Sequence, residues 1–276
     1  MNKKLWEAST SQKKKSLLSS YEQFISKKFK KRFNQKYDNI LKWSIENPGN
    51  FWSSIWDFSE IKGFKSKIKI KKSKIFYKNK FLPNSKLNFA ENLLSKNNKN
   101  KAITFVSENG FREERSWYEL NINVSKISKF LKSIKIKKKD RVAAYMPNTI
   151  ETIEAFIASS SLGAIWSSCS PDFGVKGVVE RFSQISPKVL FVVDKYFYNG
   201  KIINILERVP LILKEIPSIK YVVIVNYPGE KYLENKYTSK KSKVLKWSEL
   251  MKQESEEIQF PKFDFEQDLA ILYSSG

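Results

Sequence analysis

The chain has 276 residues, one cysteine and no histidine, and its 51 lysines and arginines against 28 acidic residues give a formal net charge of +23 at pH 7. The missing histidine excludes Ser-His and Cys-His catalytic arrangements and histidine metal ligands. The single cysteine excludes an intramolecular disulfide and a cysteine-based zinc site. Apolar residues make up 41% of the sequence, enough for a sizeable core. No apolar run reaches the ~18 residues that span a bilayer, and the N-terminus has no apolar stretch of signal-peptide length, so we predict a cytoplasmic protein without a membrane partner.

The positive charge has two interpretations. One is a nucleic acid or an anionic membrane as partner. The other is the residue bias of a low-GC genome, because lysine, asparagine, isoleucine and phenylalanine are all abundant. Of the basic residues 45 are lysine and 6 are arginine, the residue better suited to bidentate phosphate and base contacts. We therefore predict mainly solvated lysine and no specific nucleic-acid partner, with a polyanion site as the alternative.

The first hundred residues have helical and irregular patterns. Residues 1–35 are polar and lysine-rich, which indicates a frayed helix. Residues 37–58 predict two helices, because Asn47-Pro48-Gly49 separates two apolar stripes of helical spacing. Residues 62–80 alternate lysine with isoleucine or phenylalanine, a pattern typical of an edge strand or a loop.

From residue 102 the pattern changes to alternating strands and helices. Asn109-Gly110 predicts a hairpin between strands at 102–107 and 111–117. Asn148, with Glu151 three residues later, predicts a helix N-cap, and Gly163 predicts the C-cap of the same helix. The other predicted elements are helices over 117–134, 175–185, 199–216 (interrupted at Pro210) and 247–252, and strands over 141–145, 165–166, 188–193, 221–225 and 269–273. This order predicts an α/β fold with a mostly parallel sheet covered on both faces.

Two segments could bind phosphate. The last predicted strand runs into Tyr273-Ser274-Ser275-Gly276, whose hydroxyls and unhindered amides could wrap phosphate oxygens, although an ordinary strand exit explains the same residues. Gly200 and Lys201 follow the strand over 188–193, near the edge where ligands bind in open α/β sheets.

A third segment, residues 162–174, is rich in small residues and ends in a Pro-Asp-Phe-Gly turn before a helix. It is typical of a tightly packed strand and turn. We expect Cys169 within it to be a small buried residue rather than a nucleophile, because no base or cation lies nearby in the sequence.

Taken in order, segments 87–94, 140–148, 163–174, 187–191 and 271–276 resemble the N-terminal part of the acyl-CoA synthetases of the adenylate-forming superfamily. The sequence of residues 166–174, WSSCSPDFG, is more similar to the acetoacetyl-CoA branch than to the acetyl- and propionyl-CoA branches, which carry a Gly-Gly-Phe-Ser type of sequence there. Residues 37–58 are similar to the helical extension that precedes the main domain.

The resemblance implies an acetoacetate–CoA ligase. Acetoacetate and Mg²⁺-ATP would form an acyl-adenylate and diphosphate, and the CoA thiol would then displace AMP. Residues 273–276 would open the ATP phosphate loop, and Gly200 and Lys201 would lie near the 3′-phospho-ADP group of CoA, with Tyr198 in the place of a second cation. The resemblance places no catalytic residue and no metal ligand within the chain, since the catalytic lysine of the family lies beyond it.

The resemblance also implies three parts: a lysine-rich segment over 1–36, the helical extension over 37–100, and a truncated AMP-binding domain over 101–276 that ends inside the phosphate loop. We expect an N-terminal fragment that is inactive by itself. The alternatives are an acetyl- or propionyl-type synthetase and a non-catalytic, lysine-rich binding module.

Overall fold

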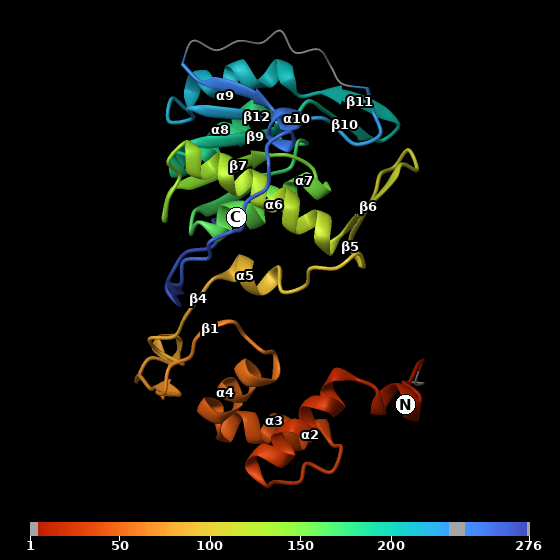
Figure 1. The fold of residues 1–276 in the computed structure, drawn as a ribbon, viewed down its shortest axis with the longest axis vertical. Helices are drawn as coiled ribbons and strands as arrows, with labels where there is room; N and C mark the ends of the chain where they lie inside the picture. Colours follow the sequence, from red (N-terminus) through yellow and green to blue (C-terminus); the bar gives the residue numbers. More distant parts are fainter. Residues whose placement is uncertain (1–4, 232–240, 275–276) are drawn as a thin grey trace. The chain divides into compact units, whose positions relative to one another are not determined.

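The computed structural model describes residues 5–231 and 241–274, and Figure 1 shows its elements along the chain. The chain divides into two compact units, residues 1–86 and 87–276, and each is described by itself. In the described ranges no helix combines the length and the apolar character that a membrane crossing requires.

The first unit consists of helices around an aromatic cluster, followed by short strands. Trp43 is buried against Phe33, with ring centroids 5.4 Å apart, and Pro48 begins a helix directly after the end of the preceding one. The two helices predicted over 37–58 are confirmed. The elements are α1 (Thr10–Lys14), α2 (Leu17–Phe29), α3 (Tyr37–Glu46), α4 (Pro48–Phe58), β1 (Gly63–Phe64), β2 (Ile70–Lys71), the 3₁₀ turn η1 (Phe76–Lys78), β3 (Lys80–Phe81) and β4 (Lys86–Leu87), the last of which crosses the unit boundary.

The second unit is built on a five-stranded parallel sheet of strand order β13-β12-β9-β7-β8. Its strands are β5 (Lys101–Val106), β6 (Arg112–Ser116), β7 (Arg141–Tyr145), β8 (Ile165–Cys169), β9 (Val189–Val193), β10 (Lys195–Tyr198), β11 (Lys201–Asn204), β12 (Tyr221–Val225), β13 (Lys243–Lys246) and β14 (Phe263–Asp264). Its helices are α5 (Phe89–Leu93), α6 (Trp117–Ser133), α7 (Ile150–Ser161), α8 (Val175–Ile185), η2 (Leu206–Arg208), α9 (Val209–Glu215) and α10 (Trp247–Met251).

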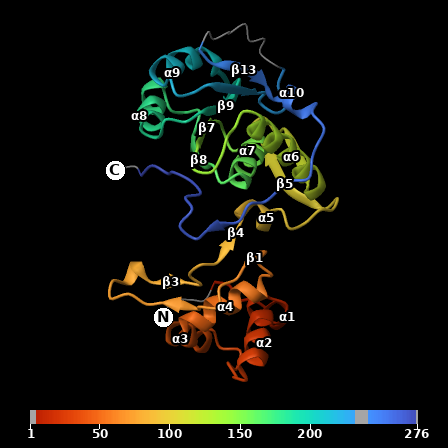
Figure 2. The same cartoon turned by 60° about the vertical axis from the view of Figure 1, so that its left-hand side comes forward.

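The sheet is the core of this unit because its central strands are apolar on both faces. All five residues of β9 are buried, as are the last four of β7 and of β12. Strands covered on both sides have this continuous apolar character, whereas half-exposed strands alternate. Figure 2 shows α6, α7 and α10 on one face of the sheet and α8 and α9 on the other. The predicted α/β fold with a covered parallel sheet is therefore confirmed.

Three local predictions are wrong. No helix begins at residue 199, because Tyr198 pairs with Lys201 across a two-residue turn that joins β10 to β11. Pro210 lies in the first turn of α9, where its missing N–H needs no partner, instead of interrupting a helix. The N-cap of α7 is Thr149 and not Asn148, and its side chain makes no capping hydrogen bond to the helix backbone.

Gly163 follows the end of α7 with φ +71°, as its predicted capping role requires. A Cβ atom added there would lie 2.5 Å from the ring of Phe263, so the close approach of this ring also requires glycine. Sequence reasoning found neither β13 nor the full length of β8, which was predicted over residues 165–166 only.

Candidate functional site

A cavity of about 290 Å³ opens at the carboxyl ends of the central strands. Its walls come from the residues after β7, from the end of β8 and the loop after it, and from β10, which follows β9. The chain runs from β7 to β8 on one side and then returns to β9 on the other, so the strand order reverses at this point. Ligands of open α/β sheets bind at such reversals. The lining residues are 146–148, Thr152, 168–172 and 196–198.

The loop after β8 is held by a group that we call the loop clamp, formed by Tyr145 and Arg208 on the backbone carbonyls of Pro171 and Phe173. Arg208 Nη1 donates to the Tyr145 hydroxyl at 2.7 Å, to Pro171 O at 2.9 Å and to Phe173 O at 3.2 Å. The Tyr145 hydroxyl lies within hydrogen-bond distance of the same two carbonyls, which share its one proton. Burial raises the pKa of Tyr145, and the hydrogen bond from Arg208 partly offsets this. The cavity wall is therefore fixed by charge-assisted hydrogen bonds.

Asp172 lies on the same wall with both carboxylate oxygens engaged. Oδ1 accepts from the Tyr196 hydroxyl at 2.8 Å, and Oδ2 accepts from Ser170 Oγ at 2.6 Å. Burial, followed by the hydrogen bond to Asp172, raises the pKa of Tyr196 to about 12. The tyrosine thus stays protonated at neutral pH and acts as a hydrogen-bond donor.

Cys169 is buried at the end of β8, as the sequence predicted, and burial raises the pKa of its thiol to about 11. A thiol with a raised pKa is protonated at neutral pH and is a poor nucleophile.

The structure places Gly200 and Lys201 at the β10–β11 turn. Asn199 and Gly200 have φ values of +49° and +74°, the backbone that a two-residue hairpin turn requires. Lys201 is exposed and lies directly opposite Tyr198, which lines the cavity. The predicted phosphate contact therefore lies beside the cavity, on a hairpin instead of a helix.

The segment predicted as the last strand lies beside β8 but forms only one parallel bridge, between Trp166 and Ala270. The Tyr273 hydroxyl donates to Arg181 O at 2.7 Å, and the Arg181 guanidinium lies 4.1 Å from the Phe173 ring centroid. Ser274 is exposed. Ser275 and Gly276, which were also predicted to bind phosphate, lie outside the described residues.

Sequence reasoning missed Tyr145, Asp172, Arg181 and Arg208 as site residues. One signal could have found the two arginines. In a chain where 45 of 51 basic residues are lysine, each of the six arginines is a candidate for a position that requires a planar, multidentate donor.

A second buried polar group lies away from the cavity, where α7 packs against α6 and β6. Glu154 is 0% exposed, and its Oε1 accepts from Asn123 Nδ2 at 2.8 Å. Arg115 Nε lies 3.1 Å from the same oxygen without the alignment of a hydrogen bond. Oε2 of Glu154 and Oε2 of buried Glu151 have no hydrogen-bond partner. Burial raises the pKa of Glu154 to about 8, with Arg115 opposing the shift, and burial also raises the pKa of Glu151.

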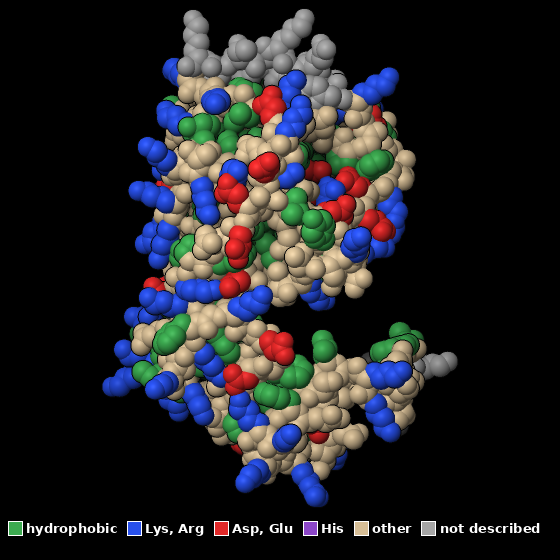
Figure 3. Space-filling model, in the orientation of Figure 1, with side chains coloured by type: hydrophobic (Ala, Val, Ile, Leu, Met, Phe, Trp, Pro, Cys, Tyr) green, Lys and Arg blue, Asp and Glu red, His purple; other side chains and the backbone are tan. Residues whose placement is uncertain are grey.

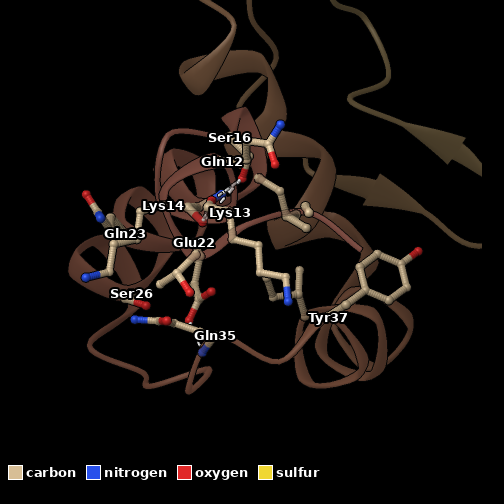
Figure 4. Close-up of a pocket in the computed structure, with 14 residues that line it drawn as sticks. Gln12, Lys13, Lys14, Ser16, Glu22, Gln23, Ser26, Gln35 and Tyr37 are labelled. Carbon is tan, nitrogen blue, oxygen red and sulfur yellow. Dashed lines mark hydrogen bonds between the residues drawn. The ribbon is translucent and has the colours of Figure 1, made fainter. Parts of the chain in front are cut away.

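The first unit carries a hollow between α1, α2 and the start of α3 (Figure 4). Three of its polar side chains have partners: Glu22 accepts from Gln35 N at 2.8 Å, Gln12 caps α1, and Lys13 pairs with Glu7. None of the predicted site residues line it. In residues 5–231 and 241–274, no group of three or more His, Cys, Asp or Glu side chains is placed to hold a metal ion.

Comparison with known proteins matches residues 92–276 to the AMP-binding enzyme family. The chain is 40% identical over 194 residues to the acetoacetyl-coenzyme A synthetase of Rhizobium meliloti (strain 1021), covering 70% of this chain and 30% of that protein. It is 33% identical over 259 residues to the acetoacetyl-CoA synthetase of Macaca fascicularis, covering 88% of this chain and 37% of that protein. The chain thus spans about a third of the length of these relatives.

The fold is similar to that of acetoacetyl-CoA synthetase from Streptomyces lividans, with a TM-score of 0.88 and 24% identity over 100% of this chain and 42% of that one. At this identity the likeness establishes the fold alone. The family match, by contrast, extends over well more than half of the chain. The chain therefore belongs to the AMP-binding enzyme family.

Proposed function

We propose that this chain is part of an acetoacetate–CoA ligase that acts in the cytoplasm and forms acetoacetyl-CoA, AMP and diphosphate from acetoacetate, ATP and CoA. The observation that carries the proposal is the 33% identity to an acetoacetyl-CoA synthetase over 88% of this chain. The cavity at the carboxyl ends of β7, β8 and β9 agrees with a nucleotide-binding role for this part of the protein.

The cavity and the β10–β11 turn together suit the phosphorylated nucleotide end of CoA. Ser168, Ser170 and Tyr198 bring hydroxyl groups to the cavity, and Lys201 brings a positive charge to the adjoining turn. A lysine acts on phosphate as a point charge and not as a fork, so a single lysine gives modest selectivity for the 3′-phosphate.

Tyr273 and Ser274, with Ser275 and Gly276, would grip the phosphates of ATP. The hydrogen bond from Tyr273 to Arg181 O supports this proposal, because it fixes the segment that leads into the proposed loop. In the first step the acetoacetate carboxylate attacks the α-phosphate and diphosphate leaves. In the second step the CoA thiol loses its proton, its sulfur attacks the acyl carbonyl, and AMP leaves.

In this proposal the residues of the cavity and of the β10–β11 turn bind and orient the substrates. The residues that the structure describes form no carboxylate set for Mg²⁺, so no step is assigned to that ion. Since the chain spans only 37% of the relative's length, we propose that residues 1–276 alone form no acetoacetyl-CoA.

A chimeric enzyme tests whether this chain can replace the corresponding part of an acetoacetyl-CoA synthetase. The matching segment of the Rhizobium meliloti synthetase would be replaced by this chain, and a second chimera would use an acetyl-CoA synthetase as host. AMP release with acetoacetate is expected from the first chimera and no turnover from the second. Turnover in the acetyl-CoA host alone would favour the acetyl- or propionyl-type alternative.

Binding to the chain itself tests the CoA contact. Calorimetry with CoA and with dephospho-CoA, which lacks the 3′-phosphate, should show that Lys201→Gln weakens CoA binding by about threefold to tenfold and leaves dephospho-CoA unchanged, as expected for one exposed charge pair. Lys214→Gln, at an exposed lysine in α9, is the matched control. Equal losses for both ligands would reject the proposed contact.

A further inference from the structure

The hairpin formed by β2, η1 and β3 in the first unit carries apolar side chains at its tip. Ile75, Phe76 and Tyr77 are 42%, 88% and 80% exposed. In Figure 2 this hairpin extends away from the helices of its unit. Two aromatic side chains and one aliphatic side chain in sequence form a contiguous apolar patch, which in soluble proteins indicates an interaction surface when it is rimmed by polar groups.

Hydrogen bonds hold the tip in one conformation. Ser73 N donates to Asn79 Oδ1 at 2.7 Å and Ile75 N to Ser73 Oγ at 3.2 Å, and η1 turns the chain between them. At the base, the Phe81 ring packs against Trp52 with centroids 5.7 Å apart. The patch is therefore presented by an ordered turn, so binding through it requires little further ordering of the backbone.

The surroundings of this tip are uniformly positive. Residues 61–90 contain ten lysines and no aspartate or glutamate. In the part of the chain that the structure describes, Lys71, Lys72, Lys74 and Lys78 are exposed and form no ion pair with a carboxylate. Lys71 lies directly opposite Lys80 in the hairpin, so two lysines meet at its base. Figure 3 shows lysines gathered around hydrophobic side chains here.

We propose that this hairpin docks the protein on the surface of an anionic lipid bilayer, with Ile75, Phe76 and Tyr77 in the interfacial layer and the lysines on the lipid headgroups. Interfacial binding is strong when buried apolar area is combined with attraction to anionic lipids, and both are present here. Lysine side chains can reach headgroups while their stems cover apolar surface. This proposal departs from the prediction that the chain has no membrane partner and takes up the alternative interpretation of its positive charge, an anionic membrane surface.

Nucleic acid fits this surface less well. Proteins that bind single strands stack bases in a groove that follows the phosphate backbone, and they draw on arginine as well as lysine. Here the aromatic side chains lie on a projecting turn, one of the three apolar residues is aliphatic, and every basic residue of the hairpin is lysine.

Vesicle sedimentation of the whole 276-residue chain tests the proposal. Binding to vesicles of 30% phosphatidylserine in phosphatidylcholine is expected to exceed binding to pure phosphatidylcholine by at least about tenfold. Phe76→Ser with Tyr77→Ser should weaken the anionic-vesicle binding by about tenfold or more, from the lost apolar transfer. Phe265→Ser, at a phenylalanine 80% exposed in the second unit, should leave it unchanged.

The role of the hairpin lysines is tested by comparing their replacement with the replacement of an equal number of lysines elsewhere in the chain. Changing Lys71, Lys72, Lys74 and Lys78 to glutamine should lower binding by about 600-fold, from roughly fivefold for each of the four lysines near the surface. Glutamine at Lys132, Lys135, Lys137 and Lys214 gives the protein the same net charge as the first variant but should lower vesicle binding far less. Equal losses from both sets, or a tip variant that binds vesicles as well as the parent, would overturn the proposal in favour of unspecific attraction by net charge.

Site-specific fluorescence locates the contact. In a Cys169→Ser background, Phe76→Cys labelled with an environment-sensitive dye should shift its emission to the blue on anionic vesicles, whereas Phe265→Cys should not. A blue shift at residue 76 with single-stranded RNA, and none with vesicles, would assign the hairpin to nucleic acid and reject the lipid surface.

Discussion

Two groups of buried polar side chains in the second unit differ in how completely their atoms are hydrogen-bonded. In the loop clamp, each hydrogen-bonding atom of Tyr145 and the Nη1 of Arg208 meet a partner, and the result is a fixed cavity wall. In the group around Glu154, one carboxylate oxygen of Glu154 and one of Glu151 have none. A buried charge without partners is costly and is avoided by protonation. The first group should therefore control local rigidity, and the second should control how stability depends on pH.

The largest effect is expected from a substitution at Glu154, which changes how the free energy of unfolding depends on pH. The pKa of Glu154 is 4.5 in the unfolded chain and about 8 in the folded one, so the folded state keeps a proton that the unfolded state has released. The contribution of protonated Glu154 to the free energy of unfolding is therefore fully present at low pH. It is lost as the pH rises from the unfolded pKa towards the folded pKa, at up to roughly 1.4 kcal/mol per pH unit. Glu154→Gln should remove this slope and gain on the order of 4 kcal/mol over the parent at pH 9.

Urea denaturation between pH 5 and 9 measures the difference between the two proteins. Glu257→Gln, at an exposed glutamate, is the control and should run parallel to the parent. A Glu154→Gln variant with the parent's pH slope would show that Glu154 is ionised in the folded protein.

The next largest effect is expected from substitutions of Arg208 that disrupt the loop clamp. Arg208→Ala should lower the free energy of unfolding by about 3 kcal/mol, because a charged donor to three oxygens is lost and these are left partly unpaired. Arg208→Lys should recover only part of this, since an ammonium group does not reproduce the planar fork. Amide exchange at residues 170–174 should accelerate in both variants. An unchanged exchange rate would contradict the role in fixing the cavity wall.

Tyr145→Phe is a smaller change within the same group. The loss of one hydroxyl should cost about 1.5 kcal/mol in unfolding free energy. Because Tyr145 and Arg208 share their partners, the double variant with Arg208→Ala should lose less than the sum of the single losses, by about 1 kcal/mol. Strict additivity in urea denaturation would mean that the two side chains act separately.

The smallest effect concerns the edge of the clamp. Tyr196→Phe should cost about 1 kcal/mol or less, since Asp172 keeps its hydrogen bond from Ser170. Ultraviolet titration of the parent should show a tyrosine that ionises near pH 12, and this component should disappear in the variant. If the component persists, the high pKa belongs to another tyrosine.

Periodicity predicted most of the fold. The strands at 141–145 and 221–225 and the helix at 175–185 agree with β7, β12 and α8, because apolar spacing follows directly from burial. The Asn-Gly dipeptide predicts the turn at 109–110 correctly. At 199–200 the same dipeptide forms a turn where the sequence predicts a helix, because the apolar spacing between Ile202 and Ile212 imitates a helix, whereas Asn199 and Gly200 adopt the positive φ that Asn-Gly favours.

The sequence by itself determined the α/β class, the order of the elements and the family resemblance, since these rest on local spacing and on motifs. Only the tertiary structure decided which polar groups meet. Tyr145 and Arg208 lie 63 residues apart and touch because β7 and η2 end at the same edge of the sheet. It also decided that two carboxylates of α7 are buried with unpartnered oxygens. Partners and desolvation depend on packing in three dimensions, which no local pattern in the chain records.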